Sequence, residues 1–210
     1  MHSKLLNRFH ISAEEVRDFR SNHAGFSGID RRRVSSLLLA QLVAAGKHGQ
    51  FDPFSVTDVI QALEDSGRAL EIRTDIFKHP PLEGLWKAHF FDARFILKNL
   101  INQWRLESER DHKFEELCMR IASEEDREPT PGGWQHRLSH ELVIGGFKRR
   151  ASKRKLTGEW IIYGKLNDNN IYLCLARHTK NKGEDATLYN SIVEHCASEF
   201  PLLFKHPLKA

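Results

Sequence analysis

Cysteine is scarce in this sequence. Its 210 residues include three cysteines, Cys118, Cys174 and Cys196, and no CxxC pair. An odd number of widely spaced thiols in apolar surroundings supports neither a disulfide framework nor a cysteine-based zinc site, and is typical of reduced, buried thiols. We therefore predict a cytoplasmic protein.

Long apolar runs are absent as well. No stretch approaches the roughly 18 apolar residues that a membrane-spanning helix needs. The segment Met1 to His10 has no continuous apolar core of the signal-peptide type. We expect no membrane among its partners.

The sequence also lacks the common signatures of cofactor-dependent and hydrolytic enzymes. It contains no P-loop, no Rossmann glycine fingerprint, no GxSxG and no HExxH, which disfavours kinases, dehydrogenases and serine hydrolases. His136 and His140 are spaced for one helix face, but a zinc site needs further ligands. The prediction is no cofactor and no metal.

What the sequence does have is an ordinary globular composition with clustered positive charge. It is 40% hydrophobic and 29% charged, with a formal net charge of +4. Six cations lie within eight residues with no acid among them: Lys148, Arg149, Arg150, Lys153, Arg154 and Lys155. Such a run either binds nucleic-acid phosphates or forms a solvated loop.

The first third of the chain has helical patterns. Ser12 and Glu15 have the spacing of a capping box, so a short helix is expected to follow Ser12. A leucine-rich helix is expected after Asp30, ending near Gly46 or Gly49, and a third helix over 55–65. We predict a helical N-terminal region over residues 1–68.

Strand patterns begin after this region. Apolar and polar residues alternate over 69–77 and 82–91, and 159–166 and 171–176 form a hairpin joined by an Asn- and Asp-rich turn. Helical patterns cover 94–104, 109–125 and 186–200, and a loop is expected at 128–133. The sequence thus predicts an α+β fold, in which a small twisted antiparallel sheet is flanked by helices. The sheet domain would span 69–210, with a helical insertion near 95–133.

Candidate catalytic residues gather at strand ends. Arg177, His178 and Lys180 follow the hairpin, and alternation places His178 and Lys180 on one side and Arg177 on the other. Histidine moves protons near neutral pH, and Lys or Arg stabilises the charge of a phosphoryl transition state. An RNA-cleaving site that uses the ribose 2′-OH needs those roles and no metal. The alternative is a solvated strand end.

Other residues could complete such a site. Lys87 and His89 share one face of their predicted strand, although His89 also suits a buried structural position. On the hairpin, Tyr163 could stack on bases or pack in the core, and Lys165 could contact phosphates.

Two segments carry a family resemblance. The run from Gly158-Glu159-Trp160-Ile161-Ile162-Tyr163 to Leu175-Ala176-Arg177-His178 resembles the small toxin ribonucleases of the RelE type, in the barnase/colicin/RelE class. His79-Pro80-Pro81-Leu82-Glu83-Gly84-Leu85-Trp86-Lys87 is similar to the segment that precedes a core strand in RelE relatives. The resemblance covers about residues 70–205. The N-terminal helices and the insertion have no counterpart in the minimal fold of that family.

The resemblance implies a metal-independent endoribonuclease toxin. It places the site at His178, Arg177 and Lys180, with His89 and Lys87 as neighbours, and assigns no acid or base. It implies RNA as the substrate, in some relatives on the ribosome, and an antitoxin or immunity protein as a partner. The alternatives are a non-catalytic nucleic-acid-binding regulator and a protein-interaction module of a phage or mobile element.

Overall fold

The computed structural model describes residues 3–65, 72–90, 92, 95–106, 112–146, 149 and 159–204. The chain forms two compact units. The first unit comprises Met1–Phe91 together with Glu159–Ala210, and the second unit comprises Asp92–Gly158. The N-terminal helices and the sheet therefore lie in the same unit, and the second unit is inserted between two strands of that sheet.

The first unit begins with two short helices, α1 (Ser3–Phe9) and α2 (Ala13–Asn22). The predicted capping box of α2 is confirmed: the Glu15 amide donates to Ser12 Oγ at 3.0 Å, and the Ser12 amide donates to Glu15 Oε2 at 2.6 Å. Short 3-10 turns follow as η1 (Ala24–Phe26) and η2 (Arg31–Arg33).

The helix expected after Asp30 begins later than predicted. Asp30 caps only η2, and α3 (Ser36–Lys47) is capped by Ser35, whose Oγ accepts from the Leu38 amide. Helix α4 (Phe54–Glu64) matches the third predicted helix. Both helices bury apolar faces in the main core, including Leu38, Leu42, Val56 and Ile60.

The sheet is antiparallel, with the order β1 (Thr74–Ile76), β2 (Trp86–Phe90), β3 (Glu159–Leu166) and β4 (Asn169–Ala176). These four strands are the ones that the described residues contribute to the sheet. Asn167 and Asp168 turn the β3–β4 hairpin with φ angles of 48° and 63°, the left-handed values that a two-residue turn between right-twisted strands requires. The predicted α+β class with an N-terminal helical region is confirmed.

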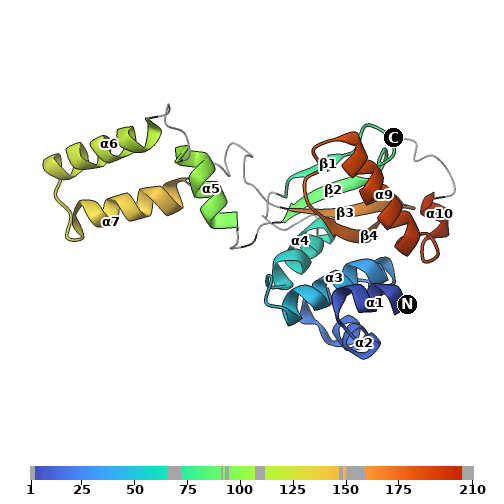
Figure 1. Ribbon diagram of the computed structural model, residues 1–210. Coiled ribbons are helices and arrows are strands. Elements are labelled where there is room, and N and C mark those ends of the chain that lie inside the picture. The colour runs from blue at the N-terminus through green and yellow to red at the C-terminus, as the bar shows by residue number, and fades with distance from the viewer. Residues whose placement is uncertain are drawn as a thin grey trace. The chain divides into compact units, whose positions relative to one another are not determined.

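Helices cover both faces of this sheet (Figure 1). Tyr172 of β4 points toward α4, where its hydroxyl donates to Glu64 Oε1 at 2.6 Å. On the other face, Gly164 of β3 lies against Leu203 of α10 (Pro201–Phe204). Helix α9 (Lys182–Cys196) packs on β4 and contributes Ile192 and Cys196 to the core.

Helix α3 also closes the outer edge of β4. The Ser35 amide donates to the Tyr172 carbonyl at 2.9 Å. The side chain of Gln41 forms two bonds with the backbone of Leu175, accepting at 2.7 Å and donating at 3.0 Å. These side-chain and loop groups take the place of a neighbouring strand.

The second unit is helical in its described part. It contains α5 (Phe95–Trp104), α6 (Lys113–Arg127), α7 (Gly133–His140) and a π-helical turn, η3 (Glu141–Gly145). Its small core consists of Trp104, Leu117 and Ile121. The indole of Trp104 donates to the Leu142 carbonyl at 3.0 Å, which ties α5 to η3.

Candidate active site

One end of the sheet brings together residues that are far apart in sequence. The register pairs His89 near the end of β2 with Trp160 near the start of β3, and Trp160 with Ala176 at the end of β4. His178 follows Ala176 by two residues. Because side chains alternate along extended chain, His89, Trp160 and His178 lie on the same side.

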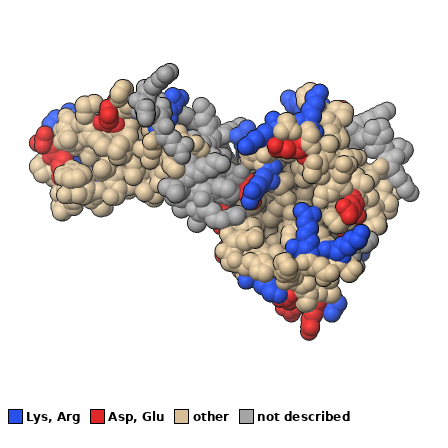
Figure 2. All heavy atoms as spheres, in the orientation of Figure 1, with Lys and Arg blue, Asp and Glu red and all other residues tan. Residues whose placement is uncertain are grey.

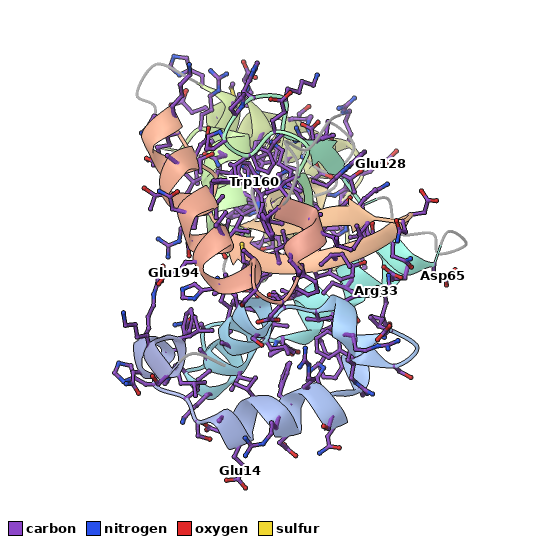
Figure 3. All side chains as sticks on the ribbon, turned by 90° about the vertical axis from the view of Figure 1, so that its right-hand side faces the viewer. Glu14, Arg33, Asp65, Glu128, Trp160 and Glu194 are labelled. Atoms are coloured by element: carbon purple, nitrogen blue, oxygen red, sulfur yellow. The ribbon has the colours of Figure 1, made fainter. Side chains whose placement is uncertain are left out.

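The three rings form an aromatic cluster at this end of the sheet, in which His178 stacks on Trp160 and His89 meets both rings edge-on. The imidazole of His178 lies 4.4 Å from the ring of Trp160, between centroids, at an interplanar angle of 26°. The rings of His178 and His89 are 5.1 Å apart and inclined at 64°. His178 is exposed, whereas Trp160 retains 6% of its accessible surface. Figure 3 shows Trp160 among the side chains of the sheet unit. The cluster thus consists of a buried indole, Trp160, and an accessible imidazole, His178, stacked on it.

His89 is held in its neutral form. The Trp160 indole donates through Nε1 to His89 Nε2 at 3.2 Å, so this geometry places the imidazole proton on Nδ1. His89 Nδ1 is buried and has no hydrogen-bond partner among the described residues. Burial, followed by the positive charges of His178, Arg73 and Lys87, lowers the pKa of His89 to about 4. With both nitrogens engaged or buried, His89 is suited to support its neighbours rather than to exchange protons with a ligand.

Lys87 borders the same cluster. Its ammonium lies 4.4 Å from the ring centroid of Trp160 and 4.6 Å from that of Phe77, within range of a cation–π interaction. Asp75 Oδ2 lies 4.0 Å away. The Lys87 side chain is 18% exposed. A ligand at this position would meet a positive charge held in place by aromatic rings.

Arg177 and Lys180 occupy the exposed segment around His178. Arg177 Nε lies 3.6 Å from Glu159 Oε1, and the Arg177 side chain is 90% exposed. The Lys180 amide donates to Glu184 Oε2 at 2.8 Å, next to the Asn181 cap of α9, and its side chain extends into solvent. The structure thus brings His178, His89 and Lys87 together, whereas Arg177 is paired with the β3 carboxylate.

Of the two alternatives expected for Tyr163, base stacking and core packing, the structure shows core packing. Tyr163 is only 3% exposed, and its ring packs against Trp86 and Tyr172 in the core. Burial raises its pKa to about 12. The neighbouring Lys165 is exposed and holds its ammonium 4.5 Å from the ring of Trp86.

The basic run is largely outside the described residues. That holds for Lys148, Arg150, Lys153, Arg154 and Lys155. Arg149 belongs to the second unit, where its Nη1 lies 2.9 Å from Glu141 Oε2 and its guanidinium covers the Trp104 ring. The run ends at Lys155, a few residues before Trp160 in the sequence.

Charge on the described surface is mixed. In Figure 2, Lys and Arg side chains appear at several separate places, with Asp and Glu between them. Acidic residues outnumber basic residues in the described ranges, because much of the positive charge of the chain falls outside them.

Sequence reasoning found the histidines but missed Trp160 as the residue that joins them. Trp160 lies opposite His89 because of the register between β2 and β3. The alternation pattern of each single strand does not specify that register. Phe77, which meets the Trp160 ring edge-on at 5.6 Å, was missed for the same reason.

The described residues contain no group of three or more His, Cys, Asp or Glu side chains placed to hold a metal ion. Within the same ranges, every helix is too short or too polar to cross a membrane.

Comparisons with known proteins gave no match: no family model, no curated protein and no solved structure is similar to this chain.

Proposed function

We propose that this protein is a metal-independent endoribonuclease that cleaves RNA by attack of a ribose 2′-OH on the adjacent phosphate. The observation that carries the proposal is the cluster itself. An exposed imidazole, His178, is stacked on Trp160, and the ammonium of Lys87 contacts the same indole. These are the groups that proton transfer and charge stabilisation at a phosphate require.

In this reaction His178 exchanges protons with the RNA. One proton leaves the 2′-OH as that oxygen attacks phosphorus, and another reaches the 5′-oxygen of the departing nucleotide. His178 is the accessible group for one of these transfers. Lys87, together with Arg177 and Lys180, which lie on either side of His178 in the sequence, would stabilise the negative charge that builds on the phosphate oxygens. The product would carry a 2′,3′-cyclic phosphate.

The basic run would hold the flanking phosphates. Its six cations precede β3 directly and are joined to the strand that carries Trp160. Binding through such contacts weakens steeply as salt rises. The proposal includes a cytoplasmic toxin role with an antitoxin or immunity protein as partner, as in the RelE-type ribonucleases that the sequence resembles.

Cleavage of RNA by the purified protein in EDTA tests the proposal. We expect cyclic-phosphate products from RNA and no cleavage of the matching 2′-deoxy strand. His178→Ala should lose at least about tenfold in rate, because it removes a proton-transfer group. His10→Ala is the matched control, since His10 is an exposed imidazole in the turn after α1 and should leave the rate unchanged.

Two results would count against the enzyme. Intact RNA at high protein concentration with salt-sensitive RNA retention would favour a non-catalytic nucleic-acid-binding protein. Equal rates for the wild type and His178→Ala would remove His178 from the chemistry. In cells, expression of the wild type should arrest growth, and His178→Ala should relieve that arrest.

A further inference from the structure

We infer that Trp160 is the positioning residue of this site, and that His89 acts on His178 through it. The inference rests on the proposed function, because it assigns a role in the same reaction. It assigns a role to Trp160, a side chain that neither exchanges protons with the substrate nor carries a charge.

Several neighbours hold the Trp160 indole in place. Phe77 meets its ring edge-on at 84°, the Lys87 ammonium covers the ring at 4.4 Å, and its N–H is bound by His89. Trp160 also belongs to a strand that is paired on both sides, with β2 and with β4. An indole fixed by three neighbours and by two strands is a rigid platform.

The Trp160 indole in turn orients the imidazole of His178. His178 lies two residues beyond the last residue of β4, where the sheet no longer fixes the backbone. The parallel stack on Trp160 therefore orients its imidazole in place of a strand pairing. Stacked aromatic pairs add to the free energy of burial alone, so this contact favours one ring orientation.

His89 holds the indole through a hydrogen bond that requires a neutral imidazole. Its Nε2 can accept the indole N–H only while the imidazole is neutral, because an imidazolium has donors on both nitrogens. Burial and the charges of His178, Arg73 and Lys87 favour that neutral form, against the opposing effect of the Asp75 carboxylate. This hydrogen bond to His89 thus fixes the side-chain orientation of Trp160. It thereby fixes the ring face on which His178 stacks.

Catalysis depends steeply on such placement. A displacement of about 1 Å of a reacting group can cost on the order of 100-fold in rate. Loss of the platform should therefore lower kcat about 10- to 100-fold and leave KM nearly unchanged, because the cations that hold RNA remain.

The experiment compares Trp160→Leu, which removes the ring, with Trp160→Phe, which keeps a ring but loses the N–H. Trp134→Leu is the control, since Trp134 is 52% exposed and lies in the second unit. Steady-state kinetics on a short RNA give kcat and KM. Two-dimensional NMR of isotope-labelled histidine reports the ring-current shift of the His178 protons, which depends on the stack and not on activity.

We expect the His178 signals to lie upfield in the wild type, to return downfield in Trp160→Leu and to stay partly upfield in Trp160→Phe. The kcat values should follow the same order, and His89→Ala should move the His178 signals as well. Unchanged signals in Trp160→Leu, or a folded Trp160→Leu with full kcat, would overturn the inference. Inactive wild-type protein whose signals respond as expected would overturn the ribonuclease proposal and still support the platform.

Discussion

His89 links the stability of the fold to the candidate site at the scale of single residues. Its accepting nitrogen is occupied by the Trp160 indole and its other nitrogen is buried. Protonation would break the first contact and place a charge beside Lys87 and Arg73. The folded state therefore binds a proton on His89 less readily than the unfolded chain does.

The consequence is a loss of stability in acid. The pKa of His89 falls from 6.5 to about 4 on folding, so the unfolded chain takes up this proton first as the pH drops. We expect the contribution of His89 to fall progressively between pH 6.5 and pH 4, by at most about 3 kcal/mol. Urea unfolding at several pH values measures it.

His89→Gln provides the comparison for that measurement. Its amide oxygen can accept the indole N–H and does not titrate, so the variant should lose less stability than the wild type over the same pH interval. Parallel pH dependences for the two proteins would show that His89 is not a source of the acid sensitivity.

At the scale of elements, α10 depends on the absence of a side chain in β3. A Cβ built on Gly164 would lie 2.6 Å from Leu203 Cδ1 and 2.7 Å from its Cδ2. Leu203 is itself 2% exposed and has little room to move. This close approach lets the last helix lie directly on the strand.

Gly164→Ala should therefore destabilise the protein by about 1–3 kcal/mol, the usual cost of overpacking. Leu203→Ala makes room for the new methyl group, so it should cost less stability in the Gly164→Ala protein than in the wild type. The double variant would then be more stable than the sum of the two single effects predicts. Denaturant melts of the four proteins test this coupling, and strict additivity would contradict it.

The same scale shows what sequence patterns can and cannot predict. The Asn-Asp turn and the Ser12–Glu15 cap were predicted, because local chemistry alone determines them. The start of α3 was placed too early, because Asp30 and Ser35 are both good caps and the pairing of Ser35 with β4 decides between them. The use of Tyr163 was left open between base stacking and core packing, because a hairpin with two apolar faces does not reveal how closely helices cover each face.

At the scale of the whole molecule, the second unit interrupts a hairpin. Phe90 at the end of β2 is paired with Glu159 at the start of β3, although residues 91–158 separate them in the chain. Cα atoms of paired antiparallel residues lie roughly 4.5–5.5 Å apart. The sheet therefore does not need the second unit to close.

Replacing residues 91–158 with Asn-Gly should leave the first unit folded. That dipeptide forms the two-residue turn that suits antiparallel strands. Circular dichroism and the upfield signals of His178 would report whether the sheet and the stack persist. An unfolded product would show that the second unit contributes to the stability of the first.

The edges of the sheet limit how copies of this chain can associate. Gln41 and Ser35 already bind the backbone groups that β4 would present to an incoming strand. On the opposite side, β1 has only three residues. Neither border offers a long template, so intermolecular strand addition and the fibrous growth that follows from it would first require α3 to detach.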